Sequence, residues 1–299
     1  MKNIYYILLS MVIQIAVLFQ VTTTTLQVSE SYFEGNFEFP VSVTEKKIIG
    51  WTKLDNIVSQ GFAHNGSKDH VFEEIRDFNG KKVLYAQIID DDSTLSGTTR
   101  FQWSMFLKER LDTLHLSYNI FLSPEIAELS QYPEPFEWFT IFELWNERDQ
   151  SLTASSPFNG TARWNLSINK EEGVDSPLFW TLDGEKMQPL SEAHDDIFPK
   201  QKNKTSPIYV GQWVLFDFKF IKGNPGNIII KMTPESGQTD VLFDFKGMVM
   251  YPERPELSPA FGGQAVNVFK LYTDDKILDW MRSRDKKISA MYDDFKWYK

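Results

Sequence analysis

The chain has 299 residues, of which 15% are aromatic, and a formal net charge of −10 at pH 7. This length suits one large all-β domain or two small ones, and the negative charge disfavours a nucleic-acid partner, because phosphate binding needs a basic face. The absence of cysteine excludes both a disulfide framework and a lipid anchor on cysteine.

Residues 1–25 predict a secretory signal peptide. Lys2 supplies the positive end, and residues 4–19 are almost wholly apolar. A stretch of about 16 residues is short for a membrane span, and no later segment is apolar enough to be one. We therefore expect a secreted bacterial protein, extracellular or periplasmic, whose residues 26–299 form one domain without a membrane partner.

The rest of the chain is predicted to form short strands separated by turn residues. The run 211–220 alternates cleanly, with Phe216, Phe218 and Phe220 on one face and Asp217 and Lys219 on the other. Such runs at regular spacing indicate an all-β fold, a single β-jelly-roll sandwich of two antiparallel curved sheets. The expected strands are 32–38, 82–89, 98–107, 114–122, 138–145, 162–169, 178–182, 211–220, 228–232, 241–245, 267–272 and 292–298, and short helices are expected over 124–129 and 275–284.

Three of the strands combine an apolar face with a polar face of long hydrogen-bonding side chains. A solvated sheet surface is the simple explanation, but such a surface is usually rich in Lys, Glu and Thr. Arg, Gln, Asn and His instead form directed hydrogen bonds with carboxylates and hydroxyls, as in the binding of a sugar chain. The polar faces carry Arg100 and Gln102, then His115 and Asn119, then Arg163 and Asn165.

A possible proton-transfer pair lies near the C-terminus. Alternation in the run 267–272 places Lys270 and Tyr272 on one face. A tyrosine beside a lysine can act as a general base, because the cation favours the phenolate. The alternative is a half-buried tyrosine with the lysine aliphatic chain packed beside it.

The run 138–147 is the densest cluster of aromatic and acidic residues. Burial of Glu143 in this apolar strand would raise its pKa and suit acid–base work, whereas a place on a solvated edge strand would leave it inert. A glycoside hydrolase would need a second carboxylate at a matched distance, and Glu147 does not give the acid spacing of laminarinase-type enzymes. Trp145 could serve as a stacking platform for a sugar ring.

Oxygen ligands occur near both ends of the predicted domain. Glu34 and Asn36 belong to the first strand, and Asp293 and Asp294 belong to the last. If the two terminal strands pair, these side chains become neighbours, and hard oxygen ligands of this kind suit Ca²⁺. We therefore expect a structural calcium ion here and no other cofactor.

With the strands laid out, residues 32–298 resemble the bacterial jelly-roll polysaccharide lyases, which have a concanavalin A-like fold. The segments that carry the resemblance are 96–102, 115–118, 138–146, 211–213, 270–272 and 292–295. The alginate-lyase pattern R-x-E-x-R is present only as Arg100-x-Gln102-x-Ser104, and the segment 142–144 stands where Q-I/V-H is expected. These departures disfavour alginate, and a short ulvan lyase is the nearest relative that the resemblance suggests.

The resemblance implies a secreted, monomeric lyase that cleaves an anionic polysaccharide containing uronic acid, sulfated as in ulvan, by β-elimination. Arg100 and Gln102 would neutralise the uronate carboxylate, and Tyr272, or else His115, would move the proton with help from Lys270. Arg163, Asn165, Asn119, Trp145 and Glu143 would contact the sugars. The alternatives are a non-catalytic glycan-binding module of the same fold and a glycoside hydrolase that uses Glu143.

Overall fold

A computed structural model describes residues 31–38, 42–44, 47–49, 57–65, 71–89, 98–107, 113–146, 161–187, 194–221, 223, 225–235, 237–249 and 265–298. The predicted signal peptide and its boundary with the domain lie outside these residues. Among the helices of the described residues, none is long and apolar enough to cross a membrane.

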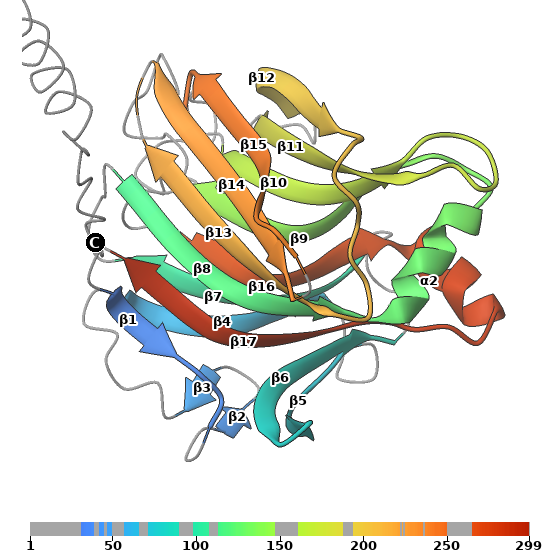
Figure 1. Ribbon diagram of the computed structural model, residues 1–299, viewed down its shortest axis with the longest axis horizontal. Coiled ribbons are helices and arrows are strands. Elements are labelled where there is room, and N and C mark those ends of the chain that lie inside the picture. Colours follow the sequence, from blue (N-terminus) through green and yellow to red (C-terminus); the bar gives the residue numbers. More distant parts are fainter. Residues whose placement is uncertain are drawn as a thin grey trace, which may run out of the picture. The chain divides into compact units, whose positions relative to one another are not determined.

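Two large antiparallel sheets make up the domain (Figure 1). The eight-stranded sheet contains, in spatial order, β15 (Asp240–Gly247), β14 (Gly226–Pro234), β13 (Trp213–Ile221), β8 (Thr113–Leu122), β17 (Ile288–Tyr298), β6 (Lys81–Ile88) and β5 (Val71–Phe78), with β1 (Ser31–Gly35) paired to β17. The seven-stranded sheet contains β12 (His194–Asn203), β11 (Leu178–Met187), β10 (Thr161–Lys170), β9 (Phe136–Asn146), β16 (Ala265–Asp274), β7 (Thr98–Leu107) and β4 (Ile57–Asn65). A separate hairpin joins β2 (Ser42–Thr44) and β3 (Lys47–Ile49).

The two expected helices are present. The 3₁₀-helix η1 (Pro124–Gln131) begins with proline, whose fixed φ suits the first helical position. The α-helix α2 (Asp275–Ser283) is capped by Asp274, whose side chain accepts a hydrogen bond from the Lys276 amide. Its apolar residues face the core, as the helical spacing predicts.

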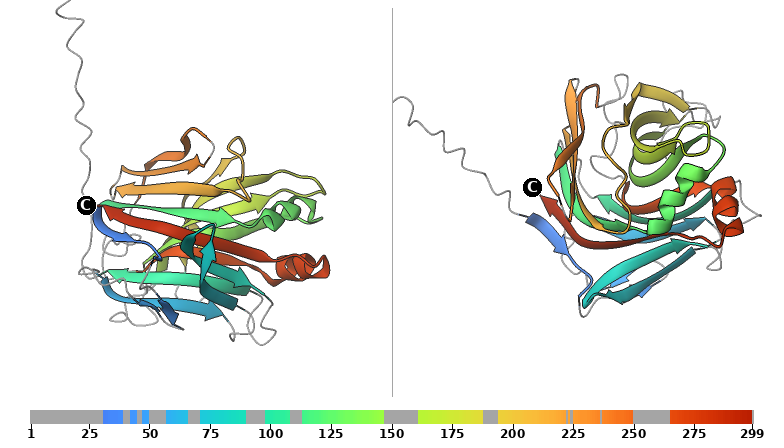
Figure 2. Two further views of the ribbon diagram at one scale, coloured as in Figure 1. Left: turned by 60° about the horizontal axis from the view of Figure 1, so that its bottom comes forward. Right: turned by 45° about the vertical axis from the view of Figure 1, so that its right-hand side comes forward.

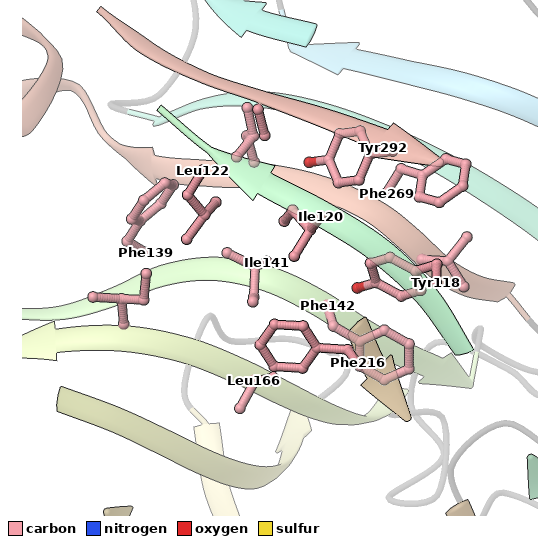
Figure 3. Packing of buried hydrophobic residues seen from close by; sticks show 14 of the residues in the cluster. Tyr118, Ile120, Leu122, Phe139, Ile141, Phe142, Leu166, Phe216, Phe269 and Tyr292 are labelled. Carbon is pink, nitrogen blue, oxygen red and sulfur yellow. The ribbon is translucent and has the colours of Figure 1, made fainter. Parts of the chain in front are cut away.

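Aromatic rings fill the space between the sheets, where inward-facing residues of both layers meet (Figure 3). Phe142 stacks on Phe218 of the opposite sheet with ring centroids 4.1 Å apart, and Tyr118 meets Phe269 edge to face at 5.5 Å. Full burial of one such side chain contributes roughly 1.5–3 kcal/mol. The alternation in 211–220 is therefore confirmed as a core pattern, since Phe216, Phe218 and Phe220 are at most 1% exposed.

One buried hydrogen bond ties the sheets together beneath β16. Tyr292 of β17 donates its hydroxyl to the Lys270 carbonyl at 3.1 Å, and its ring is fully buried. This bond holds β16 against the eight-stranded sheet at Lys270, whose side chain points to the other side of its own sheet.

The β-jelly-roll sandwich of two antiparallel sheets is confirmed, and β1 lies beside β17 as expected for the terminal strands (Figure 2). Five strands are absent from the sequence-based prediction: β2, β3, β4, β5 and β12. Each of them lies at the edge of a sheet, where the side chains that face inward are less completely buried than on interior strands. The period-two pattern of apolar residues is therefore weaker there. In β12, charged residues and Pro199 obscure the pattern further.

Candidate functional site

A row of polar side chains crosses the face of the seven-stranded sheet that points away from the core. Backbone pairing aligns Ser104, Asn267, Glu143, Asn165 and Asp183 on five adjacent strands. None of these side chains belongs to a solvated surface, because each residue is at most 6% exposed. Burial of so many polar groups is costly unless they are paired with one another or with a ligand.

Irregular pairing in β16 and β9 brings the charged residues of this face together. In β16 the register shifts between Asn267 and Phe269, so Asn267 and Lys270 share a face although they are three residues apart. In β9 a similar shift lets Thr140 and Glu143 share that face. In a regular strand, residues three apart point to opposite faces.

Glu143 is the centre of a buried ion cluster. One carboxylate oxygen accepts hydrogen bonds from the Lys270 ammonium and, at 2.7 Å, from the Asn267 amide. The other lies 3.7 Å from the Arg163 guanidinium. Burial by itself would raise the pKa of Glu143, but Lys270 and Arg163 outweigh burial and lower it, so the carboxylate stays ionised.

Burial lowers the pKa of Lys270 to about 8, with Glu143 opposing that shift and Arg100 and Arg163 adding to it. The ammonium therefore remains the main form near neutral pH, held by its ion pair. This lysine does not extend its amine to solvent, since its exposed fraction is 0%. Glu143 lies on an interior strand and is buried, so the alternative of a solvated edge strand is wrong for this residue.

Tyr272 lies at one end of this cluster and is only partly buried. Its ring is 4.8 Å from the Lys270 amine and 5.7 Å from the guanidinium carbon of Arg100. On another side it packs against the Trp138 ring, with 4.8 Å between the centroids. No hydrogen bond of its hydroxyl is found within the described parts of the chain, so this group can meet a ligand.

Several amide oxygens on the same face are buried without a hydrogen bond among the described residues: Gln102 Oε1, Asn165 Oδ1 and Asn267 Oδ1. Gln102 uses its amide nitrogen to reach Ser104 at 2.9 Å. An unsatisfied buried acceptor costs about 1–3 kcal/mol, so a cluster of them marks a place where a ligand can supply donors. Sugar hydroxyls are donors of this kind.

The structure brings together most of the site residues expected from the sequence. Arg100, Gln102, Lys270, Tyr272, Glu143, Arg163 and Asn165 all belong to the seven-stranded sheet and lie within a few paired positions of one another. Trp145 pairs with Arg163 along the backbone, but its side chain lies outside the described residues.

His115 and Asn119 do not join this group. Both belong to β8 of the eight-stranded sheet and point away from the core, on the opposite outer face of the sandwich. His115 lies 2.9 Å from Asp217 and stacks on Tyr298, and Asn119 donates to Asp294 at 2.9 Å. A single site that includes either residue and Lys270 is excluded, because β8 belongs to the other layer. The sequence does not reveal this difference, since the polar faces of β7 and β8 have the same pattern.

The residues expected to bind calcium belong to the paired strands β1 and β17, except Asn36, which directly follows β1. Glu34 lies 3.9 Å from the Lys296 amine, and the Asn36 side chain accepts the Glu38 amide. Asp293 is buried, whereas Asp294 binds Asn119. No group of three or more His, Cys, Asp or Glu among the described residues is arranged to hold a metal ion, and the calcium site stays a prediction.

Sequence reasoning missed four members of the polar face: Asn267, Trp138, Asp183 and Lys200. Asn267 shares the face of Lys270 only through the β16 irregularity, for which the sequence gives no signal. Asp183 follows an apolar run and could have been found by alternation from Leu178. Lys200 lies on the unrecognised strand β12 and makes ion pairs with Glu137 and Asp183.

No protein-family model matches the sequence, and no curated protein matches it. The fold is similar to solved structures of polysaccharide lyases. A variant of the alginate lyase Aly36B in complex with an alginate trisaccharide aligns over 90% of this chain and 98% of its own, at 8% identity and a TM-score of 0.49. The marine alginate lyase from Aplysia kurodai aligns over 89% of this chain and 98% of its own, at 9% identity and a TM-score of 0.47. The endo-beta-1,4-glucuronan lyase from the fungus Trichoderma reesei aligns over 90% of this chain and 95% of its own, at 10% identity and a TM-score of 0.43. At such low identity the likeness concerns the arrangement of the strands alone.

Proposed function

We propose that this protein is a polysaccharide lyase that cleaves a uronic-acid-containing polysaccharide by β-elimination on the polar face of the seven-stranded sheet. The observation that carries the proposal is the position of Tyr272, a partly buried tyrosine without a hydrogen-bond partner among the described residues, beside the cations of Lys270 and Arg100. A phenol that exchanges a proton next to two positive charges is suited to abstracting a proton from an anionic sugar.

The first task of a lyase is to make the C5 proton of the uronate acidic. Arg100 and the second amide N–H of Gln102 are proposed to donate to the uronate carboxylate, so that the charge that develops as the proton leaves is spread toward it. The local charge supports this role, because Arg163 and Lys270 lie beside the Glu143 carboxylate and the charges of Arg100 and Arg163 both act on Lys270, so three cations gather in this part of the sheet. A positive patch of this kind overrides the negative net charge of the chain.

Tyr272 is proposed to take the C5 proton. The C5–H electron pair then forms the C4–C5 double bond, the C4–O4 bond breaks, and O4 takes a proton from the Tyr272 hydroxyl, which regenerates the base. Lys270 supplies the electrostatic support for the phenolate, and Glu143 supports the charge on Lys270 by opposing the effect of burial on its pKa. Arg163 and Asn165 are proposed to contact neighbouring sugars.

The geometry disfavours hydrolysis by Glu143. Both of its oxygens are engaged, and Lys270 and Arg163 lower its pKa against the effect of burial. A general acid needs a proton near neutral pH, which a lowered pKa denies to it. A binding module of the same fold needs no cation beside a free tyrosine hydroxyl, so this arrangement favours an enzyme.

We further propose, following the sequence resemblance, that the protein is secreted, acts as a monomer and degrades a polymer that, like the ulvan backbone, combines uronates with a second kind of sugar. The test is to incubate the protein with ulvan, glucuronan and alginate and to weigh the products by mass spectrometry. Elimination gives chains that end in an unsaturated uronate, each lighter by one water than the corresponding product of hydrolysis. Saturated products would support a hydrolase, and affinity without products would support a binding module.

A further inference from the structure

A pocket of about 350 Å³ lies between the loop before β9, the start of β9 and the start of α2. Its lining includes Tyr132, Glu134, Glu137, Trp138, Asp274 and Lys276. This volume falls at the lower end of the range of small-molecule sites, which is about 300–1,000 Å³.

The pocket adjoins the proposed active site through Trp138. This ring lines the pocket and packs against Tyr272 at a centroid distance of 4.8 Å. The pairing of β9 with β10 is irregular between Phe136 and Phe139, both of which face the core, so the two residues between them turn outward. The Trp138 ring is therefore shared by the pocket and by the proposed active site.

The pocket and the proposed active site have opposite charge. Three carboxylates and one ammonium line the pocket, which gives a net charge of −2. Lys200 binds Glu137 at 3.1 Å, but it also faces Asp183 at 3.6 Å, so it serves two carboxylates at once. Burial raises the pKa of Tyr132, and the nearby carboxylates of Glu134 and Asp274 raise it further.

We infer that this pocket binds an uncharged sugar next to the cleaved uronate, so that the preferred substrate alternates a uronate with a neutral sugar. This inference rests on the proposed function and names its substrate class. The hydroxyls of a neutral sugar can donate to Glu134, Glu137 and Asp274, and the ring can stack on Trp138. A second uronate, or a sulfated sugar, would place its anion against three carboxylates.

The test compares kcat/KM on three polymers by the absorbance of the unsaturated product. Chemically desulfated ulvan presents a neutral sugar beside each uronate, native ulvan presents a sulfated one, and glucuronan presents another uronate. We expect desulfated ulvan to be cleaved at least about tenfold more efficiently than glucuronan, with native ulvan below the desulfated form. Equal efficiency on desulfated ulvan and glucuronan would overturn the inference and leave the lyase proposal standing.

A variant that lacks two of the pocket carboxylates tests whether the pocket causes the preference for desulfated ulvan over glucuronan. In Glu134→Gln/Glu137→Gln we expect the ratio of the two efficiencies to fall to within about threefold, mainly through faster cleavage of glucuronan. The control Glu235→Gln/Asp240→Asn removes the same charge near the turn between β14 and β15 and should leave the ratio unchanged. An unchanged ratio in the pocket variant, shown by its melting temperature to be folded, would overturn the inference. Absence of unsaturated product from every polymer would overturn the lyase proposal and the inference together.

Discussion

Glu143 and Lys270 are individually unsuited to the buried positions that they occupy. Each is at most 1% exposed, and removing an isolated charge from water costs several kcal/mol even after the protein relaxes. The pair is tolerated because Asn267 and Arg163 complete the shell around the carboxylate. Beside Tyr272, the effect of Glu143 is to oppose burial and so to keep the positive charge on Lys270.

The first prediction concerns this ion pair. Glu143→Gln should destabilise the protein by about 3–5 kcal/mol, because it leaves the Lys270 ammonium buried without its counter-ion. The double variant Glu143→Gln/Lys270→Met should lose less than the sum of the losses in Glu143→Gln and Lys270→Met. Urea denaturation of the four proteins measures both effects. Strictly additive losses would mean that the two residues do not interact.

The second prediction concerns His115, which the sequence offers as an alternative proton carrier. Because this residue lies on the outer face of the other sheet, bound to Asp217 and stacked on Tyr298, His115→Gln should leave kcat within about twofold of the wild type. A loss comparable to that of a Tyr272 variant would contradict the placement of the site on the seven-stranded sheet.

At the scale of the elements, β16 is the strand on which the site depends. Its irregular pairing turns Asn267 and Lys270 to the same side, and the Lys270 carbonyl accepts the hydroxyl of Tyr292 from the opposite layer. The strand is thereby held between an ion cluster on its outer side and a hydrogen bond on its inner side.

The third prediction tests that inner attachment. Tyr292→Phe should destabilise the protein by about 1–3 kcal/mol, because the Lys270 carbonyl is left buried without this partner. Tyr85→Phe is a suitable control, since the Tyr85 hydroxyl makes a hydrogen bond with Gln87 in a less buried place. Thermal unfolding of both variants gives the comparison, and equal losses would show that burial of the bond is unimportant.

At the scale of the whole molecule, stability should depend on pH through Asp293. Burial, followed by the neighbouring charge of Asp294, raises the pKa of Asp293 to about 6. The folded state therefore holds this proton more tightly than the unfolded state. As a result, the carboxyl group favours folding increasingly as the pH falls through 6 toward the ordinary aspartate range.

The fourth prediction follows from that sign. Asp293→Asn should be more stable than the wild type by about 1–3 kcal/mol at about pH 7.5, and the difference should vanish near pH 4, where both side chains are neutral. Urea denaturation at the two pH values measures the difference. A gain that is the same at both pH values would contradict a charge effect.

The layered fold could be predicted from the sequence because interior strands bury every second side chain, as Phe216, Phe218 and Phe220 do. The assignment of strands to layers could not be predicted. The strands that carry Gln102 and His115 have the same alternation, and only long-range pairing puts them in different sheets. Asn267 could not be predicted either, because an inserted residue reverses the faces that follow it. On a regular stretch of an interior strand, as at Arg163 and Asn165, alternation predicts the face on which a side chain lies, and the structure has both residues on the polar face.

The most direct test of the central claim is a time course of ultraviolet absorbance from the unsaturated product, recorded with the wild type, Tyr272→Phe and Tyr298→Phe on the same uronate polymer. Tyr298 serves as the control because its hydroxyl binds Ser117 on the outer face of the eight-stranded sheet. We predict a steady rise for the wild type and for Tyr298→Phe, and a rate at least about 100-fold lower for Tyr272→Phe with its affinity for the polymer retained. A Tyr272→Phe variant that eliminates at the wild-type rate would contradict the proposed chemistry.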